Sequence, residues 1–589
     1  MTKRHSTGAG TSSVRPSSAT DPIIEFRDFT FQYRAQASPT LHDINLSIYR
    51  GEKIAIVGQS GSGKSTLAHV INGLIPYRFP GEFTGEVRVG DIAPSKTPLH
   101  EISKIVGTVL QDPDGQFIGL TVAEDIAFSL ENDLVAHDEM HTRVRRAAEI
   151  VGIQDRLDAA PHDLSGGQKQ RVSMAGVLID EVDVLLFDEP LASLDPESGQ
   201  QAIETIDAIH KRTPEDTTIL IIEHRLEDVL HMKLDRIIVV DRGRIVADGT
   251  PNEIIASRVL TDHGIREPLY VTALRMAGHD VTAEDEAESV HSVHIPDDTR
   301  RELAQWARAP RKTPREPDPI LRLENIEFGI NETEIIKGIS TEIYRGEVVA
   351  ICGTNGAGKS TLAKLICGFE KPDSGRIYLN DEDFTDAPIA RRGRKIGFVI
   401  QNPNQMISKT MIMEEVSLVL ENIDISEDEK RTRIEQALRT CGLWAYREWP
   451  ISALSYGQRK RVTIASVMVT TPDIIILDEP TAGQDWAHYT EIMEFLKSLN
   501  DAGITIVLIT HDMHLTLEYT DRAIVMSDGR VIAEESSASV LADPELTKAA
   551  SLRTTSLYDL ALRVGEQEAL GAPLDPTAFI EQFIARENQ

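Results

Sequence analysis

The segment GQSGSGKST, residues Gly58 to Thr66, decides the fold of this chain. It fits the pattern G-x-x-x-x-G-K-[ST], and the apolar run Ile54 to Val57 before it predicts a buried strand that leads through a loop into a helix. Glycines let backbone N–H groups close around phosphate oxygens, and the start of the helix adds partial positive charge. The lysine can then reach the β- and γ-phosphates of a nucleotide, and the serine after it can ligate Mg²⁺. The candidate phosphate-binding residues are Gly58, Gln59, Ser60, Gly61, Ser62, Gly63, Lys64, Ser65 and Thr66.

The same signal occurs a second time, about half the chain further on. GTNGAGKST, residues Gly353 to Thr361, follows another apolar run, Val348 to Cys352. We therefore predict an α/β protein built from a tandem repeat of one nucleotide-binding unit. The second set of candidate residues is Gly353, Thr354, Asn355, Gly356, Ala357, Gly358, Lys359, Ser360 and Thr361.

Composition restricts the partners of this chain. Its 589 residues carry a net charge of −32, which argues against a nucleic-acid partner or an anionic lipid surface, because both need basic patches. Residues 1–20 are predicted to form a disordered leader without the apolar core of a signal peptide. No stretch of the sequence predicts a membrane span, so we expect no direct membrane insertion. The three cysteines show no metal-binding spacing and fit a reducing, cytoplasmic compartment.

Polar residues recur at matching places in the two copies. Gln111 and Gln401 each follow a strand-like run, and a glutamine repeated in this way is expected to face the site. Two strands end in paired carboxylates, at the edge where α/β sheets bind ligands. There Asp188 and Asp478 would support Mg²⁺. Glu189 and Glu479 would polarise the attacking water, and His224 and His511, each after a further apolar strand, are expected near the γ-phosphate.

Two further features carry alternative interpretations. LSGGQ and LSYGQ place Ser165, Gly167, Ser455 and Gly457 at predicted helix starts, where they form either a plain cap or a second anion-binding surface. Tyr33, upstream of the first loop, is either an ordinary strand aromatic or a stacking face for adenine. The predicted domains are residues 21–280 and 319–589, each with a small C-terminal appendage, and a linker over residues 281–318 that is rich in charge and proline.

The ordered set of phosphate loop, glutamine, LSGGQ or LSYGQ, Asp-Glu strand end, Ala-x-x-Asp turn and histidine resembles the ATP-binding cassette (ABC) ATPases. The resemblance implies two catalytic cores, each with a helical subdomain, that close head to tail around two ATP molecules with Mg²⁺. Site one would combine the first loop, Gln111, Asp188, Glu189 and His224 with Ser455 and Gly457. Site two would combine the second loop, Gln401, Asp478, Glu479 and His511 with Ser165 and Gly167. The implied Mg²⁺ ligands are Ser65, Gln111, Asp188, Ser360, Gln401 and Asp478.

The second copy departs from the first in two places. Ile330 stands where the first copy has Tyr33, and Tyr456 replaces a signature glycine. Because stacking on an aromatic ring contributes about 1–3 kcal/mol, we expect unequal nucleotide affinities. Since the lysines, glutamines, carboxylates and histidines survive in both copies, we expect two hydrolytic sites.

The segment from Gln111 to Asn132 is similar to the ATPases of energy-coupling-factor importers, which take up vitamins or transition-metal ions. That resemblance implies an integral membrane transmembrane component and a substrate-binding membrane subunit as partners, and a place at the cytoplasmic face of the cell membrane. The implied acidic contacts to the partner are Glu124, Asp125, Glu414 and Glu415. The alternatives are the tandem ATPase of a sugar importer or an exporter, or a soluble ABC protein acting on ribosomes.

Overall fold

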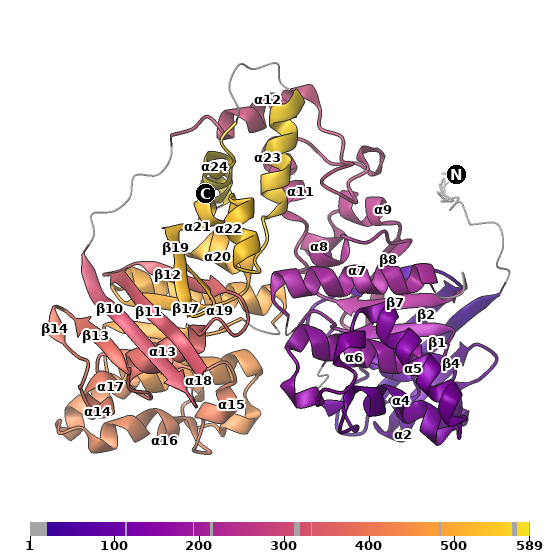
Figure 1. Ribbon diagram of the computed structural model, residues 1–589, viewed down its shortest axis with the longest axis horizontal. Coiled ribbons are helices and arrows are strands. Elements are labelled where there is room, and N and C mark those ends of the chain that lie inside the picture. Colours follow the sequence, from indigo (N-terminus) through magenta and orange to yellow (C-terminus); the bar gives the residue numbers. More distant parts are fainter. Residues whose placement is uncertain are drawn as a thin grey trace, which may run out of the picture.

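The computed structural model describes residues 21–587 except 112–114, 193, 213–215, 311–317, 332, 482–483 and 568–573. The leader predicted over residues 1–20 lies outside the described residues, as do parts of both Ala-x-x-Asp turns. The two halves of the chain form two lobes of similar build, and a group of helices joins the lobes at one end of the molecule (Figure 1). The predicted α/β class and tandem arrangement are confirmed.

A six-stranded sheet forms the centre of each lobe. Strand order is β5-β6-β7-β3-β8-β9 in the first lobe and β15-β16-β17-β12-β18-β19 in the second, and only the last pair of each sheet is antiparallel. The first sheet contains β3 (Lys53–Val57), β5 (Val106–Val109), β6 (Val184–Asp188), β7 (Thr218–Glu223), β8 (Arg236–Asp241) and β9 (Arg244–Gly249). The second contains β12 (Val348–Gly353), β15 (Ile396–Val399), β16 (Ile474–Asp478), β17 (Thr505–Ile509), β18 (Arg522–Ser527) and β19 (Arg530–Ser536). Residues 54–57 are fully buried, as expected for a parallel strand covered on both faces.

A smaller antiparallel sheet completes the core of each lobe. The first lobe has β1 (Pro22–Tyr33), β2 (Leu41–Tyr49) and β4 (Gly81–Val89), and the second has β10 (Pro319–Ile330), β11 (Thr333–Tyr344), β13 (Ser374–Leu379) and β14 (Glu382–Asp383). Apolar residues of β1 and β2 share one buried core with β3 and the helix after it. The core helices are α1 (Lys64–Ile71), α2 (Leu74–Tyr77), α3 (Leu99–Ile102), α7 (Pro196–Arg212), α8 (Leu226–Val229), α13 (Lys359–Cys367), α14 (Ile389–Arg392), α19 (Trp486–Asp501) and α20 (Met513–Tyr519).

A helical subdomain follows the glutamine segment in each half. Its helices are α4 (Val122–Asn132), α5 (His137–Val151) and α6 (Gly166–Leu178) in the first lobe, and α15 (Pro403–Met406), α16 (Ile412–Ser417), α17 (Glu427–Thr440) and α18 (Tyr456–Met468) in the second. The signature helices α6 and α18 begin with capping boxes, in which Ser165 and Ser455 accept from the backbone N–H three residues on. This helix-start role is the plain cap that the sequence allowed for both serines.

The helices that join the lobes come from both halves of the chain. They are α9 (Pro251–Ala256), α10 (Val259–Asp262), α11 (Leu269–Met276) and α12 (Asp297–Trp306), with α21 (Ser537–Leu541), α22 (Pro544–Ala549), α23 (Ser556–Gln567) and α24 (Pro576–Glu587). In Figure 1, α11, α12, α23 and α24 stand together between the lobes. Their buried apolar side chains belong to a single core, which also takes in residues of β12 and β18. We call residues 251–310 and 537–587, within the described chain, the apex.

The linker predicted over residues 281–318 is wrong for most of its length. Val281, Val290 and Val293 are buried, and α12 places Leu303 and Trp306 in the apex core at 0% and 1% exposure. The Trp306 ring lies 5.5 Å from that of Phe579 on α24. The apolar residues here are widely spaced along the chain, and most of their partners lie in the second half, so sequence pattern alone does not reveal them. Residues 311–317 of the predicted linker lie outside the described residues.

Candidate functional site

The phosphate loops connect the central strands β3 and β12 to α1 and α13. Gly63 and Gly358, which directly precede the two helices, have φ angles of 108° and 92°. This left-handed backbone favours glycine, and a Cβ on Gly63 would also lie 2.9 Å from the side chain of Leu41. The remaining predicted residues lie on the same turns or the first helical turns: Ser60, Gly61, Ser62, Ser65, Thr66, Asn355, Gly356, Ala357, Ser360 and Thr361.

The loop lysines are buried against their own loops. Nζ of Lys64 donates to the carbonyl oxygens of Gly58 and Gln59 at 2.7 and 2.9 Å. Nζ of Lys359 donates to the carbonyl oxygens of Gly353 and Thr354, each at 2.8 Å. Burial lowers the pKa of both lysines, although the nearby carboxylates Glu189 and Glu479 oppose that shift. Each amine is therefore a desolvated donor that an anionic phosphate would stabilise.

The residues predicted to hold Mg²⁺ fit that ion. Asp188 at the end of β6 has a buried oxygen, Oδ1, with no hydrogen-bond partner among the described residues. The Ser65 hydroxyl hydrogen-bonds to this carboxylate, and Ser360 does the same for Asp478. Burial raises the pKa of both aspartates, as expected for carboxylates that lack a full complement of positive charge. A hard cation between hydroxyl and carboxylate oxygens would supply that charge.

Glu189 and Glu479 occupy equivalent strained turns. Their φ angles are +48° and +44°, and left-handed backbone is uncommon for a residue with a bulky side chain. Each backbone N–H donates to the last residues of the neighbouring strand, Ile222 at 2.9 Å and Ile509 at 2.8 Å. Such strain persists only where the surrounding structure enforces it, and it is concentrated at functional sites.

The two glutamates differ in what they contact. Glu189 accepts a hydrogen bond from Nε2 of Gln111 at 2.7 Å, while Nδ1 of His224 lies 3.9 Å away. Glu479 instead pairs with Nδ1 of His511 at 2.7 Å. The structure therefore brings the glutamine, glutamate and histidine of site one together, but joins only the glutamate and histidine directly in site two.

The two histidines have opposite electrostatic behaviour. Burial lowers the pKa of His224 to about 4, and the charge of Glu189 does not offset this. Burial also acts to lower the pKa of His511, but the charge and hydrogen bond of Glu479 outweigh it and the pKa is raised. The distances explain the difference: Nδ1 of His511 lies 2.7 Å from Glu479, whereas Nδ1 of His224 lies 3.9 Å from Glu189. The residue before each histidine also differs, being the fully buried Glu223 in the first half and Thr510 in the second. Glu223 accepts from the backbone N–H of His224 at 3.2 Å and of Leu191 at 3.0 Å.

Tyr33 lies next to the first phosphate loop. Its hydroxyl is 3.0 Å from Oγ1 of Thr66, and its ring meets Phe31 and Phe79 edge to face. The residue is half-buried, so the interpretation as a face for adenine stays a prediction. Ile330 ends β10 at the matching place and is 50% exposed, which leaves site two without an aromatic there.

One contact between the cores of the two lobes was not predicted from the sequence. The backbone N–H of Ser60, in the first phosphate loop, donates to Oδ2 of Asp485 at 2.6 Å. Asp485 is 1% exposed, belongs to the second Ala-x-x-Asp turn and caps α19. Its counterpart Asp195 is also buried, and its charge acts on Lys359 of the opposite loop. Both turns are visible in the sequence, but their role is not, because a contact over 425 residues of separation leaves no local pattern.

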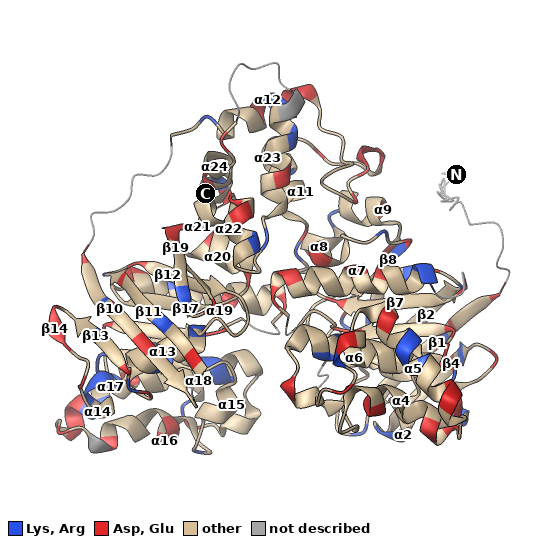
Figure 2. Cartoon of the chain, in the orientation of Figure 1, with Lys and Arg blue, Asp and Glu red and all other residues tan. Residues whose placement is uncertain are grey.

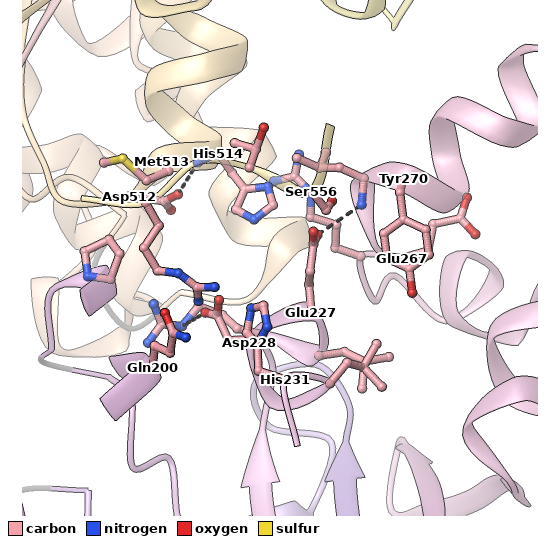
Figure 3. A pocket seen from close by; sticks show the side chains of 18 of the residues that line it. Gln200, Glu227, Asp228, His231, Glu267, Tyr270, Asp512, Met513, His514 and Ser556 are labelled. Atoms are coloured by element: carbon pink, nitrogen blue, oxygen red, sulfur yellow. Dashed lines mark hydrogen bonds and ion pairs between the residues drawn. The ribbon is translucent and has the colours of Figure 1, made fainter. Parts of the chain in front are cut away.

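A cavity of about 340 Å³ lies between the two halves of the chain, next to these sites. His224 and Glu227 line it from the first half, and Glu479, His511 and His514 line it from the second. Figure 3 shows Glu227, His231 and Tyr270 facing Asp512, Met513 and His514 across this space. The turns that carry the two histidines therefore open onto one common cavity.

The acidic residues expected to contact a partner are mostly occupied within the chain. The Glu124 carboxylate accepts from the backbone N–H groups of Leu120 and Thr121, and that of Asp125 from those of Ile118 and Gly119. Glu415 is buried and accepts from the backbone N–H groups of Ser408 and Lys409, so its predicted role as a surface contact is wrong. Among the described residues, Glu414 alone of the four is exposed and makes no side-chain hydrogen bond or ion pair.

A family model of ABC transporters matches residues 41–192 and 336–482, which hold both phosphate loops and both signature segments. A protein of Clostridium perfringens named as an ABC transporter ATP-binding protein is 53% identical over 565 residues, or 95% of this chain and 98% of that protein. The chain belongs to the ABC transporter ATP-binding proteins. It is therefore an ATPase whose two halves each carry the nucleotide-binding motifs.

Three further comparisons concern this ABC ATPase. A protein of the same description from Enterococcus faecalis is 51% identical over 96% of this chain and 99% of its own length. A second family model, described as an ATP-binding cassette cobalt transporter, matches residues 257–328. The solved structure of cbiO1 from Clostridium perfringens, described as part of the ABC transporter complex cbiONQ, is 39% identical and covers 39% of this chain and 94% of that chain, with a TM-score of 0.37.

Acidic and basic residues both occur throughout the ABC ATPase. Figure 2 shows acidic and basic residues interspersed over both lobes. None of the helices in the described part of the chain is long and apolar enough to span a membrane.

Proposed function

We propose that this ABC ATPase is the energy-coupling subunit of a membrane importer of the energy-coupling-factor type. The observation that carries the proposal is the match of residues 257–328 to a family described as an ATP-binding cassette cobalt transporter. This segment includes α11 and α12, which help to hold the two halves together at the apex. The cargo class that fits is a transition-metal ion, a vitamin or a vitamin precursor.

Both sites would bind ATP with Mg²⁺, and both would hydrolyse it. The phosphate-loop lysines and N–H groups would bind the phosphates, and Ser65, Asp188, Ser360 and Asp478 would hold the metal ion together with Gln111 and Gln401. Bound Mg²⁺ neutralises the charge that develops on the phosphoryl oxygens. Glu189 and Glu479 orient the attacking water, and Ser455, Gly457, Ser165 and Gly167 close on the nucleotide from the opposite half. Loss of the γ-phosphate then removes the charge-assisted contacts that hold the halves closed.

The partners would be an integral membrane transmembrane component and a substrate-binding membrane subunit, which would place the chain at the cytoplasmic face. Apolar residues beside the glutamine segment of the first half support a docking surface. Ile118 and Leu120 are 64% and 82% exposed and precede α4, held in place by Asp125 and Glu124. An exposed apolar pair whose backbone is fixed in this way is suited to a partner helix.

The test is affinity purification of the chain from detergent-solubilised membranes of its host, followed by mass spectrometry. We expect two small, multi-spanning membrane proteins to be recovered with it. Leu120→Asp should reduce that recovery, whereas Leu134→Asp, at a residue that is 91% exposed just after α4, should not. Recovery of ribosomal proteins, or of no membrane protein, would refute the transport role and leave the ATPase activity unaffected.

A further inference from the structure

In the second half, side chains of the signature helix α18 form hydrogen bonds to the backbone of Gln401. Nζ of Lys460 on α18 donates to the carbonyl oxygen of Gln401 at 2.8 Å and to that of Ile400 at 3.0 Å. The hydroxyl of Tyr456, at the start of the same helix, donates to the same Gln401 oxygen at 3.4 Å. We call these three bonds the α18 clamp.

The lysine part of the clamp lies in the interior of the lobe, whereas Tyr456 is 37% exposed. Lys460 is 1% exposed, so its amine has exchanged water for these carbonyl oxygens. Burial lowers the pKa of Lys460 to about 8, and the charges of Asp478 and Glu479 of site two oppose this shift, so the amine is protonated at neutral pH. A buried cation with two acceptors, facing carboxylates, makes charge-assisted bonds that are stronger than neutral ones. The contact between Lys460 and these carbonyl oxygens is therefore a rigid, buried joint.

The first half has no such joint in the part of the chain that the structure describes. Gly166 stands where the second half has Tyr456, and Gln170 stands where it has Lys460. Gln170 is buried, and its Nε2 has no hydrogen-bond partner among the described residues. Gln111 is held through its side chain by Glu189 instead of through its carbonyl oxygen by α6.

We propose that Tyr456 and Lys460 are positioning residues that couple the two ATP sites through α18. This inference rests on the composite sites of the proposed function. Ser455, at the start of α18, would bind the nucleotide of site one, and the same helix grips Gln401, which serves site two. Movement of α18 on ATP binding at site one must then move the backbone of Gln401. Because a coupling free energy is reciprocal, occupancy of site two must favour binding at site one by the same factor.

The coupling factor is measured on the full chain in the Glu189→Gln, Glu479→Gln background, which prevents turnover. ATP affinity of site two is determined with site one intact and with site one disabled by Lys64→Ala, and the ratio of the two affinities is the coupling factor. Couplings of this kind are roughly 5–150-fold. We expect the double variant Tyr456→Gly, Lys460→Gln, which installs the residues of the first half, to bring the ratio close to one. Affinity of site two measured in the Lys64→Ala protein should stay within about twofold.

Matched variants separate coupling from damage to the fold. Lys460→Arg keeps a buried cation and should retain most of the coupling. Gln170→Ala, at the equivalent position of α6, should leave the ratio unchanged because Nε2 of Gln170 holds no partner in the described structure. Hydrogen exchange of the amides of residues 400–404 in the nucleotide-free protein should accelerate in the double variant, which reports loss of the joint without any nucleotide.

Three results would overturn the proposal. The first is a ratio of one in the parent protein, and the second is an unchanged ratio in the double variant despite faster exchange at residues 400–404. The third is an equal loss of coupling in Gln170→Ala. A separate control, Ser455→Ala, tests the composite site itself: if ATP affinity of site one is unaffected, the site assignment fails and not the joint. The membrane-partner experiment is independent of all of these outcomes.

Discussion

Each glutamate predicted to be catalytic is held on a strained turn, but by different neighbours, and this predicts two working sites of unequal rate. Glu189→Gln and Glu479→Gln should each lower steady-state ATP turnover, and the double variant should lower it by roughly 100-fold or more, the scale of general acid–base catalysis. ATP binding, measured by equilibrium dialysis, should persist in all three proteins. Unchanged turnover in either single variant would mean that only one site hydrolyses ATP.

The two histidines should respond differently to pH. The pKa of His511 is raised by its pairing with Glu479, so the stability from that ion pair is present below the ordinary histidine pKa and is lost as the pH rises through the raised value. His511→Gln should therefore cost the nucleotide-free protein about 1.5–3 kcal/mol near pH 6, the scale of a hydrogen bond to a charged group, and less at pH 9.

His224 provides the matched comparison. Because burial lowers its pKa to about 4, it stays neutral from pH 6 to pH 9 and His224→Gln should show the same stability cost at both values. Urea unfolding of the two variants, each compared with the parent protein at pH 6 and at pH 9, gives the four changes in unfolding free energy. A larger cost for His511→Gln at pH 9 than at pH 6 would contradict the charged pair.

At the scale of elements, α12 is a structural part of the apex and not of a linker. Trp306 on α12 is 1% exposed, packs on Phe579 and lies under the guanidinium of Arg586. Trp306→Ala should destabilise the apex by about 3–5 kcal/mol, the usual cost of deleting a buried large aromatic. Trp449→Ala, at a residue 47% exposed in the second helical subdomain, is the control and should cost little. Differential scanning calorimetry of both variants tests this prediction. If the two variants show equal melting curves, α12 does not belong to the apex core.

Elements marked by a local sequence pattern were predictable, whereas elements held by distant partners were not. Phosphate loops, Asp-Glu strand ends and histidines are predictable because each is a local pattern with its own chemistry, repeated in both halves. The fold of residues 281–307 was not predictable, since Val290 and Val293 offer their carbonyl oxygens to Arg563, more than 250 residues away. Such a segment looks like a charged linker until its partner is in place. The contact of Asp485 with Ser60 was not predictable for the same reason, since the two residues lie far apart in the sequence.

At the scale of the whole molecule, the apex should keep the halves together even when the chain is cut. A protease site introduced within residues 311–317 would separate the halves covalently and leave α12 on the first fragment. The fragments should still co-elute in size-exclusion chromatography, because α12 packs on α24 and Glu302 pairs with Arg586 at 3.0 Å. Trp306→Ala in the cut protein should shift the fragments toward separation. Complete separation of the unmutated fragments would show that the shared core does not hold the lobes.

Because the two lobes are joined at the apex, their closure is an intramolecular reaction and not the association of two separate molecules. Two free ATPase subunits must find each other, so their activity falls on dilution, whereas lobes tethered at one end meet at a fixed effective concentration whatever the amount of protein. Each site also always meets the same opposite half and never a copy of its own. Under such fixed stoichiometry the two halves are free to diverge, and differences such as Gln170 against Lys460 can be kept by selection because no exchange of partners averages them away.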